Sequence, residues 1–584
     1  MNKNILHTVK GVAGCLLMAS LAAGCAQEDI DTAPTGGGGM SASSYVSLSF
    51  ASQQSTPTRS NPTGGETGDG QEKGQANEQA NENEIKSAVA FFYQGSGTDG
   101  VNSSGTTPIM AVATFNVGSP TEPGNGIDRT YTTTPQQVDL DDGTYNVLVV
   151  ANPGADWWTG QSLTLDDVRN HIQTTAWTAS ESGYSDFVMT SAADATLTLN
   201  SNPENNPAKA TVNVERMAAR LDYKTTGTYT CDDPAYSGAT VEITGAALVN
   251  NLTAGSYLLK RVADDVNGVP TYLGNETPDA GVQTNYVLDP WTAGKTSANN
   301  SFTIGGEANK TAKDLYGEWF GNISQDPNYW AAYVQPGTKM TVGTEKWQRI
   351  GYTLENTTAA EEAGKRYSTG VVFKAKFHPK GVANYTDGET FFAYGTKIYA
   401  SMENMMKNFY GSKFDELDAL ITNCTTWGDV KQFITSTLLT NDPSGYNKYL
   451  EGLAEGKDDS ETVANASSLT WSKYMKNECG YSKDENGKVV LDQNDKVTRI
   501  ALKPYGTRTY EDATCYYTWW VRHSNDNDDT KKGIMEYAIV RNNIYKLTVN
   551  SVYSLGGEVP EEESLIVDVY VNDWLLLDNE TLPM

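Results

Sequence analysis

The chain has 584 residues, of which 38% are apolar, and its 54 glycines and 32 tyrosines are typical of strands and turns rather than of a helical protein. Its 72 acidic residues against 43 basic ones give a net charge of −29. Nucleic acid and anionic surfaces are recognised by clustered lysine and arginine, so this charge argues against both as partners. The acidic excess mainly keeps the protein soluble.

The first 24 residues have the pattern of a secretory signal. Lys3 and Lys10 precede an apolar run over residues 11–23, and small residues stand directly before Cys25. A cysteine at this position offers its thiol to a diacylglyceryl group, so we predict a lipoprotein signal peptide over residues 1–24 and lipidation of Cys25. The alternatives are an ordinary signal peptide with an incidental cysteine, or a signal anchor. The apolar run is shorter than the ~20 residues that span a bilayer.

Residues 25–59 are predicted to form a tether followed by a removable strand. The tether contains an acidic patch at residues 27–31 and four consecutive glycines at residues 36–39. This composition cannot pack, so we expect it to hold the folded body off a membrane.

The removable strand is expected at residues 45–50. Val46, Leu48 and Phe50 alternate with serines, which predicts a half-buried strand. Residues 52–84 then contain no Val, Ile, Leu, Met or aromatic residue. Such a segment cannot offset its ordering entropy, so we expect disorder or a long surface loop. A strand separated from its domain by such a loop is free to leave.

Residues 60–222 are predicted to form an N-terminal β domain whose strands are separated by Gly, Pro and Asp turns. The expected strands are 85–93, 108–116, 137–140, 144–151, 187–190, 195–200 and 208–215. A short helix is expected at residues 165–168, because Thr164 can cap it. The segment 214–223 is expected to mark the passage to the next domain.

Residues 223–584 are predicted to form a second β domain with a helical insertion at about 401–490. The expected strands are 240–248, 257–261, 370–377, 391–400, 500–502, 515–522, 536–540, 545–552 and 565–571. Apolar residues at helical spacing occur in the insertion and are interpreted as packing faces. They are Phe414, Leu417, Leu420, Ile421, Trp427, Val430, Phe433, Ile434 and Leu438.

No motif for catalysis, cofactor binding or metal binding stands out. Beyond His7 the only histidines are His171, His378 and His523, and none has the spacing of a metal or protease motif. We therefore predict no catalytic residue, no cofactor and no metal site, and we expect that the protein is not an enzyme. Four cysteines are too far apart for a compact zinc motif, and their disulfide state stays open. They are Cys231, Cys424, Cys479 and Cys515.

Short motifs from both ends of the chain, together with the signal before Cys25 and the strand at 45–50, form a recognisable set. The motifs are Thr56–Arg59, Val214–Arg220, Phe373–Phe377, Phe391–Phe392, Val540–Tyr545 and Val569–Trp574. Together they resemble the major fimbrillins of Bacteroidales type V fimbriae, closest to the shaft pilin of the short fimbria. The resemblance is weakest around residues 401–490.

This resemblance implies an all-β fold with two large β-sandwich or barrel-like, transthyretin-like domains. It also implies export to the cell surface as an outer-membrane lipoprotein, trimming by an arginine-specific protease, and polymerisation with copies of itself by strand exchange. Its implied further partners are accessory tip and anchor fimbrillins and a host or bacterial surface receptor.

The expected cleavage lies between Arg59 and Ser60. Arg59 is the first basic residue after Cys25, and the next arginine is Arg129. An arginine-specific protease therefore has a single target in the segment expected to be unstructured.

The segment 564–584 is predicted to be the donor strand that replaces the removed strand in the next subunit. Alternate residues of 565–571 share an apolar face, and the run after residue 573 is too apolar to lie exposed without a partner. The apolar residues can fill the vacated pockets while the backbone completes the sheet. They are Leu565, Val567, Val569, Val571, Trp574, Leu575 and Leu577. The alternative is that residues 564–577 form an internal hairpin edge of the second domain.

These observations predict the structural shaft subunit of an adhesive surface fimbria. An anchor subunit should keep its lipid, so a cleavage site at Arg59 favours the shaft over an accessory or anchor fimbrillin. The remaining alternative is a monomeric surface glycan-binding lipoprotein, for which the 12 tryptophans and 32 tyrosines would supply stacking platforms.

Overall fold

The computed structural model describes residues 43–52, 82–95, 104–120, 130–180, 183–249, 251–252, 255–264, 285–290, 301–304, 307–311, 339–342, 345–357, 368–410, 414–438, 446–471, 473–474, 507–523, 536–558 and 565–573. The chain forms one compact unit from Ala42 onward. The described residues are mostly strands arranged in several sheets, and none of these sheets closes into a barrel. The predicted all-β fold class is confirmed.

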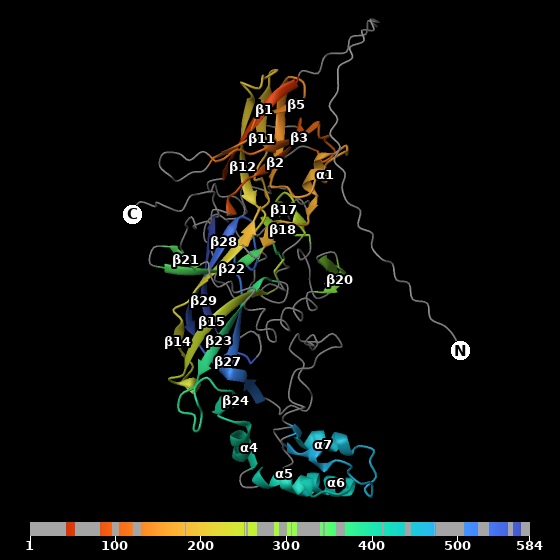
Figure 1. The fold of residues 1–584 in the computed structure, drawn as a ribbon, viewed down its shortest axis with the longest axis vertical. Helices are drawn as coiled ribbons and strands as arrows, with labels where there is room; N and C mark the ends of the chain where they lie inside the picture. The colour runs from red at the N-terminus through yellow and green to blue at the C-terminus, as the bar shows by residue number, and fades with distance from the viewer. Residues whose placement is uncertain are drawn as a thin grey trace, which may run out of the picture. The chain divides into compact units, whose positions relative to one another are not determined.

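The first sheet has nine strands and follows the order β3-β2-β6-β10-β12-β1-β4, with β11 beside β6 and β5 beside β1. Figure 1 labels β1, β2, β3, β5, β11 and β12 of this sheet. Its strands are β1 (Ser43–Ser52), β2 (Ser87–Tyr93), β3 (Ala111–Asn116), β4 (Tyr131–Thr132), β5 (Gln136–Asp139), β6 (Gly143–Ala151), β10 (Met189–Ser191), β11 (Ala195–Leu199) and β12 (Ala208–Arg216). One face of this sheet buries a hydrophobic cluster that includes Phe92, Phe115, Val147 and Val212. We call it the first-sheet core.

The opposite face of the first sheet is covered by a second cluster around helix α1 (Leu165–Arg169). Thr164 caps this helix as predicted, because its side chain accepts from the backbone N–H of Asp167 and the Asp167 carboxylate binds back to Thr164. Short strand pairs lie outside the main sheets. They are β7 (Ile172–Gln173) with β16 (Ser256–Tyr257), β8 (Thr178–Ser180) with β9 (Gly183–Ser185), β17 (Arg261–Asp264) with β18 (Asn285–Leu288), and β19 (Ser301–Ile304) with β20 (Glu307–Thr311).

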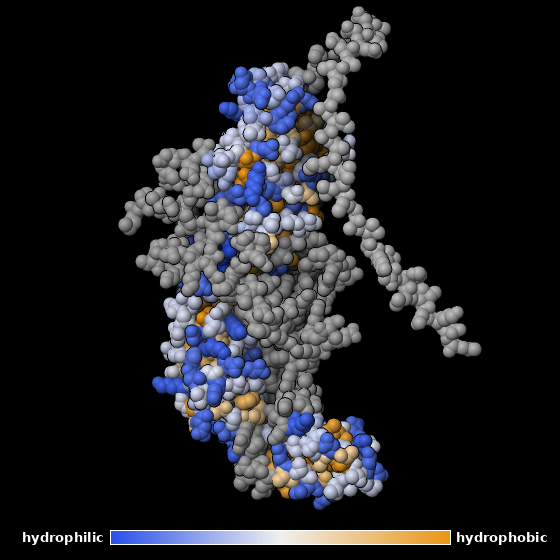
Figure 2. All heavy atoms as spheres, viewed as in Figure 1, coloured by the Kyte–Doolittle hydropathy of each residue, from blue (hydrophilic) through white to orange (hydrophobic). Residues whose placement is uncertain are grey.

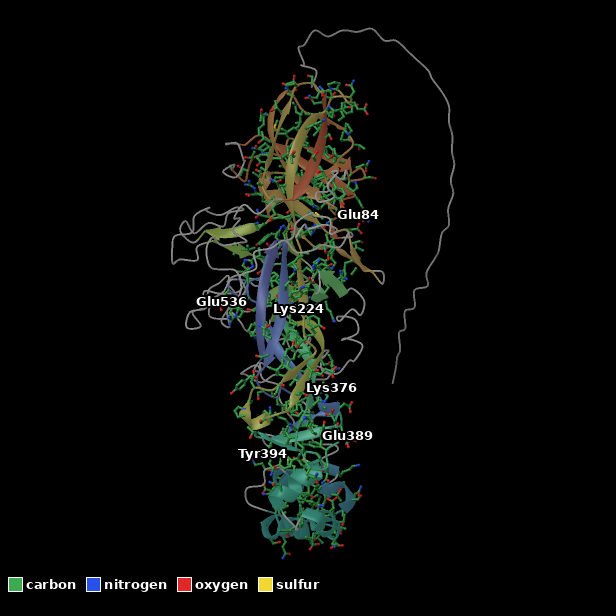
Figure 3. All side chains as sticks on the ribbon, turned by 90° about the vertical axis from the view of Figure 1, so that its left-hand side faces the viewer. Glu84, Lys224, Lys376, Glu389, Tyr394 and Glu536 are labelled. Carbon is green, nitrogen blue, oxygen red and sulfur yellow. The ribbon has the colours of Figure 1, made fainter. Side chains whose placement is uncertain are left out.

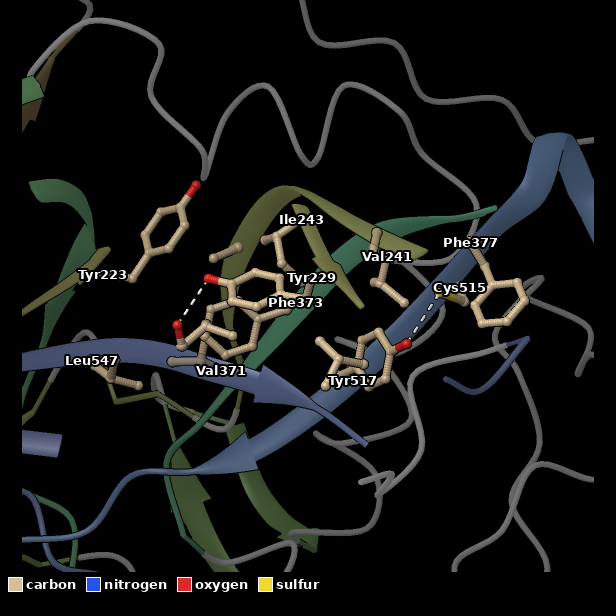
Figure 4. Close-up of a cluster of buried hydrophobic side chains, with 14 of the residues drawn as sticks. Tyr223, Tyr229, Val241, Ile243, Val371, Phe373, Phe377, Cys515, Tyr517 and Leu547 are labelled. Carbon is tan, nitrogen blue, oxygen red and sulfur yellow. Dashed lines mark hydrogen bonds between the residues drawn. The ribbon is translucent and has the colours of Figure 1, made fainter. Parts of the chain in front are cut away.

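Two further sheets pack face to face as a sandwich. The five-stranded sheet contains β21 (Lys339–Val342), β22 (Glu345–Thr353), β13 (Ala219–Lys224), β28 (Asn543–Val552) and β29 (Leu565–Asp573), and the four-stranded sheet contains β14 (Thr228–Thr230), β15 (Thr240–Val249), β23 (Gly370–His378) and β27 (Thr514–Trp520). Their inner faces share one core, in which Phe373 and Leu547 are buried (Figure 4). The Tyr229 hydroxyl is buried in this core and donates a hydrogen bond to the Val549 carbonyl at 2.8 Å.

The predicted helical insertion is confirmed. Its helices are α4 (Met402–Tyr410), α5 (Phe414–Thr422), α6 (Trp427–Ser436) and α7 (Tyr446–Ala454), followed by a 3₁₀ turn at Ala466–Leu469. The predicted packing face is buried at Leu417, Ile421 and Val430 in a separate cluster with aromatic residues. Of the other described side chains of this face, Trp427 is half-buried and Leu420 is exposed over 40% of its surface. Hydrophobic side chains accordingly show among polar ones on these helices (Figure 2).

Four local predictions are wrong. The strand expected at 257–261 is interrupted at residues 258–260, between β16 and β17, which pair with different strands. The strand expected at 391–400 is a hairpin of β24 (Phe391–Tyr394) and β25 (Lys397–Tyr399), with β26 (Thr507–Tyr510) beside β24, because Gly395 at φ +58° turns the chain. Residues 536–540 are buried but make only an isolated bridge, between Ile539 and Asn356. The segment 82–84 was expected to be disordered or part of a long surface loop, yet Glu82 and Asn83 are buried. Residues 500–502 lie outside the described residues.

Candidate functional site

The candidate site is strand β1 and the groove that holds it. β1 forms where the alternation predicts a strand, and it occupies an internal position in the first sheet. On one side it runs parallel to β12, from Val46 opposite Ala208 to Ser52 opposite Val214. On the other side it runs antiparallel to β5 and β4. The strand is therefore hydrogen-bonded along both edges.

The side chains of β1 form part of the first-sheet core. Val46, Leu48 and Phe50 are each 0% exposed and belong to the same hydrophobic cluster as Phe92 and Val212. Burying one such side chain contributes about 1.5–3 kcal/mol, so vacating all three costs roughly 5–9 kcal/mol before any rearrangement. An emptied groove thus exposes a strongly apolar floor.

The polar groups of β1 are also satisfied within the groove. The Leu48 N–H donates to the Thr133 hydroxyl at 2.9 Å, and the Leu48 carbonyl accepts from the Thr133 N–H at 2.9 Å. Ser47 donates to the Thr133 carbonyl at 3.0 Å, and the Tyr45 N–H donates to the Asn202 carbonyl at 2.8 Å. Departure of β1 would leave these partners without their present hydrogen bonds, and another extended segment could restore them.

The chain that follows β1 returns to the described structure at Glu82. Glu82 and Asn83 are both buried, 0% and 2% exposed. The polar composition of residues 52–84 gives no sign of this burial. A charged side chain is buried only where it meets suitable partners, and these can lie far away in the sequence. The predicted cleavage residues Arg59 and Ser60, and the predicted lipidation residue Cys25, lie outside the described residues.

The predicted donor segment begins as β29, the edge strand of the five-stranded sheet. It pairs antiparallel with β28, so that Val567, Val569 and Val571 stand opposite Val549, Leu547 and Tyr545. Leu565 stands opposite Val552 in the same ladder. Trp574, Leu575 and Leu577 lie outside the described residues. β1 and β29 therefore belong to different sheets of the same chain, and residues 565–573 form the internal edge of their own sheet that was the alternative to a donor strand.

The described residues give little support to other kinds of site. They contain no cluster of three or more His, Cys, Asp or Glu side chains that could hold a metal ion. No described helix has the length and apolarity needed to span a bilayer. Cys231, Cys424 and Cys515 are buried thiols, and burial raises the pKa of Cys231 to about 12. The disulfide state stays open, because Cys479 lies outside the described residues.

One family model matches the chain, described as "Major fimbrial subunit protein type IV, Fimbrillin, C-terminal", over residues 508–580. Solved structures with low similarity include one described as "Putative cell adhesion protein" from Parabacteroides distasonis, at 11% identity and TM-score 0.35, covering 91% of this chain and 100% of that one. A fimbrilin from Porphyromonas gingivalis is 13% identical with TM-score 0.31, covering 92% and 99%. The tip fimbrial protein from the same organism is 8% identical with TM-score 0.30, covering 91% and 100%.

No curated protein matches the chain. The structural likenesses are too low to support an argument about this protein, so the family match stands by itself. It spans β27, β28 and β29 and most of β26, which are strands of the sandwich and of the neighbouring hairpin. Residues 508–580 of this chain therefore match the C-terminal part of the fimbrillin family.

Proposed function

We propose that the protein is the structural shaft subunit of an adhesive cell-surface fimbria that polymerises by strand exchange. The observation that carries the proposal is the position of β1, an internal strand whose three apolar side chains fill the first-sheet core. Because the chain after β1 contains Arg59 and no other arginine before Arg129, one cut separates this strand from the rest of the protein. The match of residues 508–580 to the C-terminal part of the fimbrillin family supports the same class of protein.

In this proposal the precursor is lipidated at Cys25 and reaches the outer membrane as a lipoprotein. An arginine-specific protease cuts between Arg59 and Ser60, and β1 leaves with the lipid. The groove between β12 and β4–β5 is then filled by residues 564–584 of another copy, which add a strand and insert alternate apolar side chains. Tip and anchor fimbrillins and a surface receptor are the further partners, and no catalysis is involved.

The described tryptophans do not favour the glycan-binding alternative, because each of them is buried or half-buried. Trp158 and Trp471, for example, are 7% and 4% exposed. Among the described tyrosines, Tyr553 is 47% exposed. The buried tryptophans fill cores instead, which agrees with a structural subunit.

The proposal is tested by replacing the processing residue. Cells that make Arg59→Ala should accumulate the uncut precursor and show no filaments of this subunit by electron microscopy. Arg129→Ala is the matched control and should give normal filaments, whose N-terminal sequence begins at Ser60. Filaments from Arg59→Ala cells, or filament subunits that retain residues 43–52, would contradict the proposal.

A further inference from the structure

The chain is anchored where it re-enters the fold after the predicted processing segment. The Glu82 carboxylate binds the Arg220 guanidinium, with Nη1 and Oε2 2.7 Å apart, and both side chains are 0% exposed. Arg349 approaches the other carboxylate oxygen at 3.7 Å, and the Tyr352 hydroxyl donates to it. Arg216 Nε donates to the backbone carbonyl of Glu82 at 2.9 Å.

The partners of Glu82 come from two different sheets. Arg216 ends β12 of the first sheet, whereas Arg220 lies on β13, and Arg349 and Tyr352 lie on β22, of the five-stranded sheet. Arg216 also donates to the Asn83 side chain. These side chains, which we call the junction clamp, comprise Glu82, Asn83, Arg216, Arg220, Asp222, Arg349 and Tyr352. The clamp thus holds one short stretch of chain against both sheets at once.

The charges of the junction clamp depend on one another. Asp222 binds Arg220 at 2.8 Å from the other side. Burial lowers the Arg220 pKa, but the carboxylates of Asp222 and Glu82 more than reverse this effect, so the guanidinium stays charged. Removing the negative charge of Glu82 would leave buried arginines without full compensation, which is far more costly than losing an exposed ion pair.

A neighbouring ion pair offers the contrast. Glu84 lies two residues along the chain and binds Lys86 at 3.3 Å, but its side chain is 48% exposed and lies at the surface (Figure 3). Water screens this pair, and its contribution to stability is small. Anchoring is therefore a property of Glu82 and Asn83 rather than of acidic residues in this segment generally.

We propose that Glu82 is a positioning residue that fixes the processed chain to both sheets, so that cleavage and departure of β1 leave the groove and the start of β2 in place. The inference rests on the proposed strand exchange. Before cleavage the segment between Ser52 and Glu82 is held at both ends, by β1 and by the clamp. Once β1 has left, the clamp alone holds the new N-terminal arm, and without it opening would spread toward β2.

The test uses the full chain with a recognition site for a sequence-specific protease in place of residues 57–62. Hydrogen–deuterium exchange of residues 82–86 is measured before and after cutting, and mass spectrometry selects chains that have lost β1. In the protein without a clamp substitution, the exchange of residues 82–86 should be the same before and after β1 leaves. In Glu82→Gln it should rise about tenfold or more only after β1 leaves, because local opening then lacks both restraints. Glu84→Gln is the matched control and should behave like the unchanged protein.

The outcomes separate positioning from a general loss of stability. An equal rise in exchange before and after the cut would overturn the inference, since a merely structural role predicts that result, and so would no rise at all. If Glu82→Gln fails to fold, Asn83→Ala provides the milder variant and is judged by the same before-and-after comparison. A β1 that no cut chain releases would also overturn it. The assay needs neither lipid nor filaments, so its failure is distinct from failure of the Arg59 experiment.

Discussion

Substituting a core residue of β1 should destabilise the precursor and leave the filament unaffected. Leu48 is 0% exposed in the first-sheet core, and its backbone bonds to Thr133 do not involve the side chain. Leu48→Ala therefore removes packing alone, at a cost of about 2–5 kcal/mol. If the unfolding free energy falls by about 3 kcal/mol and depends on urea with a slope of about 3 kcal/mol per M, the urea midpoint of the precursor drops by roughly 1 M.

The same variant should form filaments that dissociate at the normal urea concentration, because β1 is absent from the processed subunit. Leu199→Ala is the matched control, since Leu199 is also 0% exposed in the same core but lies on β11, which stays in the subunit. It should lower the urea midpoints of precursor and filament alike. Urea unfolding of purified precursor, followed by fluorescence, and filament dissociation, followed by light scattering, measure the two effects. If Leu48→Ala weakens filaments as much as Leu199→Ala does, β1 remains in the filament and the reasoning is refuted.

Two further predictions follow from the same proposal, and a third concerns the cap of α6. Cys25→Ala should strand the protein in the periplasm and abolish fatty-acid labelling and surface filaments; normal surface filaments would exclude the lipid route. Deleting residues 574–584 should give a secreted, folded monomer that does not polymerise, and normal polymerisation, assessed by gel filtration and electron microscopy, would exclude the donor assignment. The Asp429 carboxylate accepts hydrogen bonds from the backbone N–H groups of Thr426 and Thr425 at 2.8 and 2.9 Å, which lower its pKa to about 2. This folded-state pKa lies below the usual 3.8. The carboxylate therefore stabilises α6 fully above pH 3.8, and this stabilisation is lost as the pH falls through about 2. An NMR titration that gives an unshifted pKa for Asp429 would contradict the cap.

Elements with a strong local pattern could be predicted from the sequence. The alternation in residues 45–50 predicts β1 because the side-chain period of a strand is two, and the structure buries Val46, Leu48 and Phe50 together. The cap at Thr164 and the apolar spacing of residues 414–438 locate helices for an equally local reason, since each depends on side chains one turn apart.

Elements that depend on distant partners could not be predicted. β13 alternates apolar and charged residues, a pattern that indicates one buried and one exposed face, yet Arg220 and Asp222 are buried along with Leu221. Their burial depends on ion pairs, including the pair between these two side chains. The apolar run at 536–540 looks like a strand, yet the fold buries it in a turn before β28, so burial by itself does not specify a ladder.

The candidate site likewise combines features that follow from local sequence with features that depend on distant partners. The sequence alone determined that β1 is apolar on one face, that its tether has little capacity to pack, and that a single arginine follows it, because composition and spacing are properties of a short segment. Only the tertiary structure decided that β1 lies between β12 and β4–β5, and that Glu82 is held by arginines of two sheets. Strand neighbours and buried ion pairs join residues far apart in the chain, and no local pattern encodes which distant groups will meet.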